Sequence, residues 1–224
     1  MARPWLIITR PEPDSRRFAE DLGEVAAELL IAPTQAIHRR PFGLPAETPD
    51  GLILTSENAA YAAASLPKGL PAWVVGQRTA AAVRAVGANV VFTAPTAEKL
   101  VTAMAEHPRD MRFLHLRGAH TTGNIAKRLG AEERIVYVQE PRPLSPAARE
   151  ALGGERAVVL PLFSPRSAVL MAAEAGLTAP LHIVAMSEAV AEAAGPLRPA
   201  RVEIAANPTA RDMCAAVRRA IARV

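Results

Sequence analysis

An internal repeat constrains the fold of this chain more than any other feature of the sequence. The segment "WLIITRPEPDSRRFAEDLGE" (Trp5 to Glu24) aligns with "FLHLRGAHTTGNIAKRLGAE" (Phe113 to Glu132). Ser56 in "LILTSENAA" aligns with Ser164 in "FSPRSAVL", 108 residues later. Two further pairs follow in the same order, "WVVGQRTAAAVRAVG" with "IVAMSEAVAEAAG" and "APTAEKLVTAM" with "NPTARDMCAAV". Chance similarity between Ala-rich helices does not produce four blocks in one order, so the sequence predicts a tandem duplication.

Each repeat alternates short apolar runs with Ala-rich stretches of helical period. We expect strands at Trp5–Thr9, Leu52–Thr55, Ala72–Val75, Val90–Phe92, Phe113–Leu116, Ala157–Leu160, His182–Ala185 and Val202–Ala205. In the first repeat we expect helices at Ser15–Leu30, Glu57–Ser65, Thr79–Val86 and Ala97–Glu106. Strands that are apolar throughout and separated by helices indicate a parallel sheet covered on both faces. The predicted fold class is therefore α/β, with two doubly wound parallel-sheet domains.

Polar residues follow the predicted strands in both repeats. In an open parallel sheet, ligands bind beyond the carboxyl ends of the strands, where helix N-termini present free N–H groups. The candidate ligand-binding residues at these ends are Arg10, Thr55, Ser56, Gln77, Arg78, Thr79, Arg117, Gly118, Ser164 and Ser187. Helix capping explains each Ser and Thr equally well, so both interpretations stay open. If the two edges faced each other, they would form one cleft that attracts anions.

The charge balance favours a small anionic partner. The net charge is +4, and 23 of the 26 basic residues are Arg, whose planar fork binds carboxylates and phosphates in pairs of hydrogen bonds. A genome rich in G and C would also explain the abundant Arg. Aromatic residues make up only 4% of the chain, so a stacking platform for single-stranded nucleic acid is not expected.

Several classes of site lack their motifs. The sequence contains no G-x-G-x-x-G after a strand, no G-x-x-x-x-G-K-[ST] and no G-x-S-x-G, and its five His residues show no metal-ligand spacing. We therefore expect no cofactor and no metal. A single cysteine, Cys214, excludes an intrachain disulfide and suits a reducing cytoplasm. No apolar run approaches the roughly 18 residues that span a bilayer, and a monomer is the default expectation.

The motifs "ITRP", "LILTSENAA", "VVGQRTAAAVRAVG", "FLHLRG", "VYVQE" and "FSPRSAVL" resemble, in order and spacing, those of the uroporphyrinogen-III synthase family. The resemblance covers nearly the whole chain. It implies a flavodoxin-like and a related α/β domain joined by two extended linkers. The implied domains are 1–36 plus 143–224, and 42–136, with linkers at about 37–41 and 137–142. Repeat one would then begin in one domain and continue in the other.

The resemblance also implies a reaction. Enzymes of this family convert the linear tetrapyrrole hydroxymethylbilane into cyclic uroporphyrinogen III, with loss of water and inversion of the last pyrrole ring. The acetate and propionate groups of that substrate suit an Arg-lined cleft. The reaction needs no metal or redox cofactor. Because the bilane closes without inversion when no enzyme is present, the main work of such an enzyme is positioning.

Particular residues match family positions. Tyr137 in "VYVQE" matches a tyrosine that is placed to assist departure of the hydroxyl group; the alternative is an aromatic anchor in a linker between the domains. Thr79 in "GQRTA", and Thr55, Ser56 and Ser164, match hydroxyl residues that face the ligand. The second repeat departs from the pattern at "VAMSEAVAEAAG". Ser187 can still donate a hydroxyl there, but Glu188 would repel substrate carboxylates unless it points away.

A second class of function stays open from the sequence. A non-catalytic, two-lobed α/β protein that closes over an anionic small molecule would share the repeat, the linkers and the polar strand ends. Formation of the type III isomer from hydroxymethylbilane would distinguish the enzyme from the binder.

Overall fold

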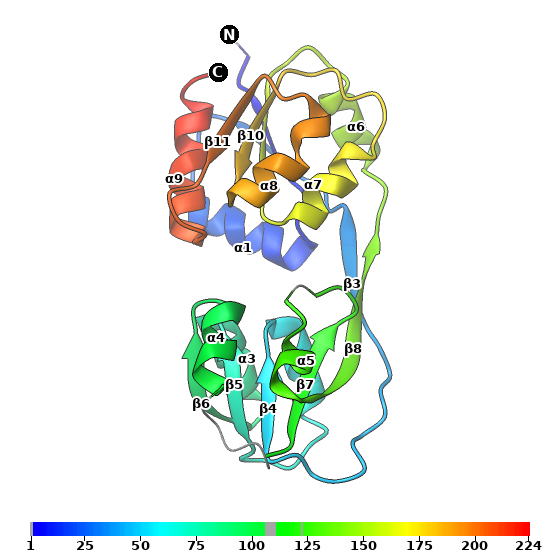
Figure 1. The fold of residues 1–224 in the computed structure, drawn as a ribbon. Coiled ribbons are helices and arrows are strands. Elements are labelled where there is room, and N and C mark those ends of the chain that lie inside the picture. Colours follow the sequence, from blue (N-terminus) through cyan, green and yellow to red (C-terminus); the bar gives the residue numbers. More distant parts are fainter. Residues whose placement is uncertain (1, 106–110, 122) are drawn as a thin grey trace. The chain divides into compact units, whose positions relative to one another are not determined.

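The chain folds into two compact units. The computed structural model describes residues 2–105, 111–121 and 123–224. Unit 1 consists of residues 1–36 and 140–224, and unit 2 consists of residues 37–139. In Figure 1 the blue N-terminal segment lies among the yellow to red elements of the C-terminal segment, and both chain ends belong to this unit. Unit 1 is therefore assembled from two segments that are distant in sequence.

Unit 1 contains a five-stranded parallel sheet. Its strands are β1 (Trp5–Ile8), β2 (Glu28–Ile31), β9 (Val158–Leu162), β10 (Leu181–Ala185) and β11 (Arg201–Ile204). Their spatial order is β11-β10-β9-β1-β2, and every pairing is parallel. If the strands are renumbered within the unit, this is the order 2-1-3-4-5 of flavodoxin-like folds.

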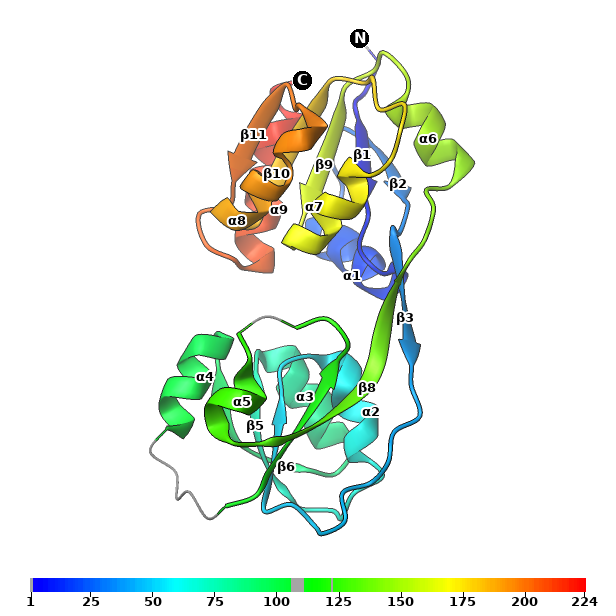
Figure 2. The same ribbon diagram turned by 45° about the vertical axis from the view of Figure 1, so that its right-hand side comes forward.

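Helices cover both faces of this sheet, as Figures 1 and 2 show. Leu6 and Ile8 of β1 pack on the face covered by α1 (Glu12–Leu22) and α9 (Ala210–Ile221). Ile7 packs on the opposite face. That face is covered by α6 (Pro146–Leu152), α7 (Pro165–Ala172) and α8 (Glu188–Ala193), followed by the short η2 (Gly195–Leu197). The alternation along β1 explains why the strand is apolar at every position.

Unit 2 contains a six-stranded sheet. Its strands are β3 (Gln35–Arg39), β4 (Gly51–Leu54), β5 (Pro71–Val75), β6 (Asn89–Ala94), β7 (Phe113–Gly118) and β8 (Glu132–Pro141). The order is β3-β8-β7-β4-β5-β6, and the pairings from β8 to β6 are parallel. The chain passes between the units within β3 and β8, which are neighbours in this sheet.

The sheet of unit 2 is also covered on both faces. Leu52 and Leu54 of β4 pack on the face of η1 (Glu57–Ala59), α2 (Ala60–Ala63) and α3 (Gln77–Ala85). Ile53 packs on the face of α4 (Ala97–Met104) and α5 (Ile125–Leu129). No helix within residues 2–105, 111–121 and 123–224 is both long enough and apolar enough to cross a membrane.

The two sheets have the same topology once the repeats are aligned. β1, α1 and β2 correspond to β7, α5 and β8, and the strands β4 to β6 correspond to β9 to β11. With these equivalences, β11-β10-β9-β1-β2 becomes β6-β5-β4-β7-β8, which is the order observed in unit 2, where β3 adds a sixth strand beside β8. The predicted fold class, two doubly wound parallel-sheet domains, is thereby confirmed.

One predicted helix is wrong over its second half. The expected helix Ser15–Leu30 ends at Leu22, and the chain forms β2 six residues later. Gly23 has a φ of 63° and its N–H group bonds the carbonyls of Ala19 and Glu20, which ends the helix. The apolar run that follows adds an edge strand beside β1. The predicted helix Glu57–Ser65 is present in shortened form, as η1 followed by α2. The end of the predicted helix Ala97–Glu106 lies outside the described residues.

Candidate active site

Each sheet has one point where its strand order reverses. This point lies between β1 and β9 in unit 1, and between β7 and β4 in unit 2. Ligands of open α/β sheets bind outside the carboxyl ends of the strands at such a point. The residues that follow these strand ends are Thr9, Arg10 and Ser164 in unit 1, and Thr55, Ser56 and Ala119 in unit 2. Four of the sequence-predicted candidates, Arg10, Thr55, Ser56 and Ser164, therefore follow strands at the reversal points.

A β-bulge precedes the strand end in unit 2. Arg117 of β7 lies opposite Ile135 of β8, but the next residue, Gly118, lies opposite Tyr137. Val136 is therefore an extra residue on β8. An extra residue moves the side chains that follow it to the other face of the strand. As a result, Tyr137 packs in the same core as Val136, on the side of α2 and α3.

The Tyr137 ring rests on the backbone of Gly118. A Cβ atom added to Gly118 would lie 2.5 to 2.8 Å from Cζ, Cε2 and the phenolic oxygen of Tyr137. The N–H group of Ala119 donates a 2.9 Å hydrogen bond to the carbonyl of Tyr137. The side chain of Tyr137 is buried, with a relative exposure of 5%. Only glycine leaves room for the ring in this position.

The Tyr137 phenol meets a second predicted residue, Ser56. The Ser56 hydroxyl lies close enough to the phenol to affect its ionisation, and it also accepts a 3.2 Å bond from the backbone N–H of Asn58 at the start of η1. Burial raises the pKa of Tyr137, and the Ser56 hydroxyl offsets this in part. The phenol is therefore protonated at neutral pH and can donate a hydrogen bond or a proton. The structure thus brings together Tyr137, Ser56 and Gly118.

Helix α3 presents three more of the predicted residues. Gly76 precedes it with a φ of 83°, a conformation that favours glycine. Gln77 and Arg78 are exposed on the first turn, whereas Thr79 is buried with a relative exposure of 5%. Thr55, at the end of β4, is half-buried. These residues share the carboxyl edge of the sheet with the Tyr137 cluster.

Arg117 is bound within unit 2. Its Nε and Nη2 atoms donate bonds of 2.9 and 2.6 Å to the two carboxylate oxygens of Glu133. Its Nη1 atom donates to the carbonyls of Gly118 at 2.9 Å and Ala119 at 3.3 Å. This pairing lowers the pKa of Glu133 and raises the pKa of Arg117. The predicted role of Arg117 in binding substrate carboxylates stays a prediction.

In unit 1, Arg10 lies between an acid and an aromatic ring. Its Nη2 atom is 3.3 Å from Oδ1 of Asp14, and its guanidinium carbon is 4.3 Å from the centre of the Phe163 ring. The hydroxyl of Ser15 donates a 2.8 Å bond to the carbonyl of Arg10. These contacts fix Arg10 at the end of β1.

The two predicted serines of unit 1 differ in their local roles. Ser164 and Ser167 form a capping box at the start of α7, with bonds of 3.1 and 3.2 Å between each hydroxyl and the backbone N–H of the other residue. Ser187 precedes α8 but makes no capping bond, so its helix does not use the hydroxyl. Glu188, the next residue, is exposed.

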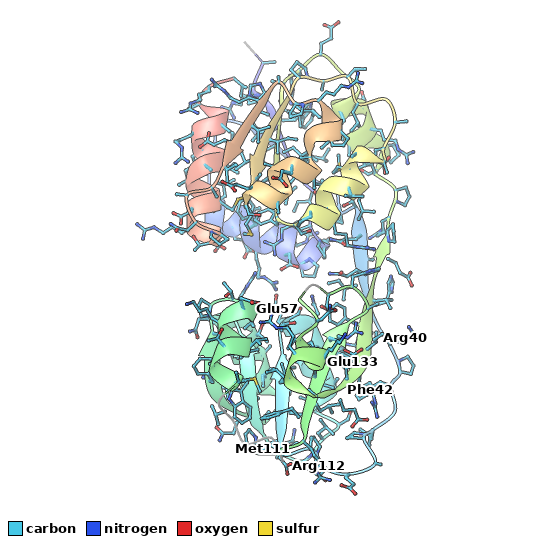
Figure 3. All side chains as sticks on the ribbon, viewed as in Figure 1. Arg40, Phe42, Glu57, Met111, Arg112 and Glu133 are labelled. Carbon is cyan, nitrogen blue, oxygen red and sulfur yellow. The ribbon has the colours of Figure 1, made fainter. Side chains whose placement is uncertain are left out.

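Sequence reasoning missed three residues that form the bulge before Tyr137 or bind the residues beside it. Glu133 binds Arg117, and Val136 forms the bulge. The Tyr61 hydroxyl, with its one proton, lies within hydrogen-bond reach of the carbonyls of Val136 and Arg40. Figure 3 labels Glu133 on β8 and Arg40 just after β3. A bulge leaves no trace in hydrophobic periodicity, and the scarcity of tyrosine, with only two in the chain, was the one available signal for Tyr61.

Metal-binding groups are not evident around this site. In the part of the chain that the structure describes, no group of three or more His, Cys, Asp or Glu residues could hold a metal ion.

Comparisons with known proteins identify the family. The family model described as uroporphyrinogen-III synthase HemD matches residues 16–215. The fold is similar to that of the uroporphyrinogen-III synthetase from Helicobacter pylori (15% identity, TM-score 0.64, covering 94% of this chain and 96% of that chain). It is also similar to a mutant uroporphyrinogen III synthase from Thermus thermophilus (15% identity, TM-score 0.57, covering 99% of this chain and 100% of that chain). A comparison with curated proteins gave no significant match. Because the family model spans most of its length, the chain belongs to the uroporphyrinogen-III synthase family.

Proposed function

We propose that this protein converts hydroxymethylbilane into uroporphyrinogen III, with loss of water and inversion of the terminal pyrrole ring. Membership of the family supports the reaction. The observation that supports a chemical role for a particular residue is the Tyr137 phenol. It is buried and protonated, and it lies close to Ser56, which follows β4 at the strand-order reversal of unit 2.

In the proposed mechanism, Tyr137 acts as the acid for the departing hydroxyl group. The bond between the methylene carbon and the hydroxyl oxygen breaks while the phenol donates its proton to that oxygen, which leaves as water. The methylene carbon becomes the electrophilic end of an azafulvene. The substituted carbon of the terminal ring attacks it to give a spiro intermediate, which opens and recloses with this ring inverted. The pyrrole rings release one proton as they regain aromaticity, and this proton restores the phenol.

We propose that the substrate's carboxylates and pyrrole N–H groups are held by the polar strand ends. The residues assigned to this role are Arg10, Thr55, Ser56, Gln77, Arg78, Thr79, Arg117, Gly118, Ser164 and Ser187. Their location at the carboxyl ends of parallel strands supports the assignment. We further propose that the protein acts as a monomer in the cytoplasm, which light scattering and fractionation would test.

The test of the catalytic role is Tyr137→Phe, which removes the acidic proton and retains the ring on Gly118. General acid assistance increases a rate by about 10²- to 10⁴-fold, so we expect the substitution to lower kcat by a factor in that range. The assay supplies freshly made hydroxymethylbilane and separates the type III and type I isomers. Full activity of the variant would exclude the acid role. If the wild-type protein gave only type I, the product formed without enzyme, the synthase function itself would be excluded and a non-catalytic binder supported.

A further inference from the structure

We propose that Arg117, Glu133 and Tyr61 are positioning residues that hold the β-bulge at Val136 and so direct the Tyr137 phenol. The consequence for catalysis rests on the proposed function of Tyr137. The geometric claim, that these side chains fix the Tyr137 ring, does not depend on it.

The bulge needs to be held because its register is not the only one available to β8. Val136 has no partner of its own on β7, since Arg117 lies opposite Ile135 and Gly118 lies opposite Tyr137. If β8 paired with β7 in uninterrupted register, Val136 would lie opposite Gly118. The side chain of Tyr137 would then point to the opposite face of the sheet, because side chains alternate along a strand. The position of the phenol therefore depends on keeping the extra residue at Val136.

The Arg117–Glu133 pair joins the two strands directly before the bulge. It links β7 to β8 through two parallel hydrogen bonds of 2.9 and 2.6 Å, and the Arg117 side chain is only 15% exposed. The same guanidinium then reaches past the bulge to the carbonyls of Gly118 and Ala119. These are the two residues that carry the ring and bond the backbone of Tyr137. The Arg117 side chain thus binds β8 before the bulge, through Glu133, and the β7 backbone after it, through the two carbonyls.

Tyr61 holds the extra residue itself. Its hydroxyl donates to the carbonyl of Val136, and that carbonyl also accepts a 2.7 Å bond from the backbone N–H of Arg40. The hydroxyl in turn accepts a 3.3 Å bond from the same N–H group. The Arg39 guanidinium lies 4.5 Å from the centre of the Tyr61 ring. The bulged carbonyl is therefore bound by a residue that is separate from the Arg117–Glu133 pair.

A second Arg–Glu pair in the same unit provides a matched control. Arg128 binds both carboxylate oxygens of Glu98 at 2.6 and 2.9 Å, joining α5 to α4. This pair resembles Arg117–Glu133 in chemistry and bond lengths, but it joins two helices instead of β7 and β8. Glu98→Gln therefore removes an equivalent ion pair without disturbing the bulge, whereas Glu133→Gln removes the pair that precedes it.

The direct test is nuclear magnetic resonance of protein labelled with carbon-13 at the tyrosine Cζ. The chain has two tyrosines, so two signals are expected, and Tyr137→Phe assigns them. Glu133→Gln should move the Tyr137 signal by more than its linewidth at neutral pH and lower the pH at which Tyr137 titrates. Tyr61→Phe leaves one signal, which should be displaced as well. Glu98→Gln should leave both signals at their wild-type positions. Unchanged Tyr137 signals in Glu133→Gln and in Tyr61→Phe would overturn the proposal.

The kinetic test separates positioning from catalysis. A displaced phenol should lower kcat by about 10- to 100-fold in Glu133→Gln, with KM nearly unchanged and a larger share of type I product. Glu98→Gln should behave as wild type. If Glu133→Gln does not fold, Glu133→Asp takes its place, since it keeps the charge while its shorter side chain loses the paired bonds to Arg117. Should Tyr137→Phe prove fully active, the acid role fails while the resonance experiment still decides the positioning role. A shifted signal with unchanged kcat would overturn its catalytic consequence.

Discussion

At the scale of single residues, the missing side chain of Gly118 is as important as the side chains around it. The Tyr137 ring occupies the space in which a Cβ atom of residue 118 would lie. Because that space is bounded by the backbone of β7 and by the buried phenol, neither partner can move without changing the position of the hydroxyl group.

We predict that Gly118→Ala lowers the rate of type III formation by about 10²-fold, since misplacement of a catalytic group by about 1 Å has effects of this size. Gly43→Ala, also in unit 2, is the control, because a Cβ atom added to Gly43 has no neighbour within 4 Å. The isomer assay measures the effect. A Gly118→Ala variant with wild-type activity would show that the reaction does not depend on the position of the Tyr137 ring.

His115 is a buried histidine without a hydrogen-bonding partner for either ring nitrogen among the described residues. Burial, and then the charge of Arg117, lower its pKa to about 4, and the neighbouring Glu133 opposes this only in part. The folded state therefore binds this proton less readily than the unfolded chain, in which the pKa is near 6.5. His115 does not reduce stability above pH 6.5, and it destabilises the fold as the pH falls from there to about 4.

We predict that His115 lowers the free energy of unfolding by about 3 kcal/mol between neutral pH and pH 4, from a pKa difference of roughly 2.5 units. His115→Leu removes this ionisation and leaves the other acid-sensitive groups in place. Urea unfolding of both proteins across this range gives the difference. Parallel pH dependences for the two proteins would contradict the prediction.

At the scale of elements, the serines that precede α7 and α8 differ in whether they cap their helix. Ser164 belongs to a capping box, while Ser187 makes no capping bond. We predict that Ser164→Ala lowers the free energy of unfolding by about 1 kcal/mol and that Ser187→Ala changes it by less than about 0.5 kcal/mol. Chemical denaturation measures both. Equal losses of stability would show that the helices use both hydroxyls.

The elements that the sequence predicted correctly are those with an unambiguous pattern. Strands such as β4 and β9 are apolar at every position because helices cover both faces, and a run of this kind is visible in one dimension. β2 and β8 were not predicted because they contain charged residues at or near the edge of a sheet. The helix predicted at Ser15–Leu30 wrongly included most of β2, because the Ala-rich run after Gly23 continues the apolar spacing of the helix into the strand.

The candidate site could be proposed from the sequence as a set of strand ends, but its contacts could not. Ser56 and Tyr137 are far apart in sequence, and their proximity depends on a bulge that no periodicity reveals. Arg117 was predicted from its charge and its place after a strand, yet its bonds to Glu133 and to two carbonyls follow from the pairing of β7 with β8.

At the scale of the whole molecule, each unit has its own core and its own tryptophan. Trp5 lies in unit 1 with the Arg156 guanidinium 3.9 Å from its ring centre, and Trp73 lies in unit 2 against Phe113 at 5.1 Å. Single-tryptophan variants, made by Trp5→Phe or Trp73→Phe, therefore report the unfolding of one unit each.

We predict that Ser164→Ala moves the unfolding midpoint reported by Trp5 to lower denaturant concentration and leaves the midpoint reported by Trp73 unchanged. The reason is that the buried residues of α7 belong to the core of unit 1. Fluorescence during urea unfolding measures both midpoints. Equal shifts at the two tryptophans would show that the units unfold as one cooperative body.

The central strand β1 has a consequence for the order of events during synthesis. It pairs with β2 and β9, and β9 begins at Val158, about 150 residues further along the chain. At about 5 to 20 residues per second, the ribosome needs roughly 8 to 30 seconds to make that distance. Meanwhile every strand of unit 2 is completed. β1 is therefore made before any strand of unit 2 but gains its β9 neighbour only after all of them, so Leu6, Ile7 and Ile8, which are buried in the folded unit, lack part of their cover during that time.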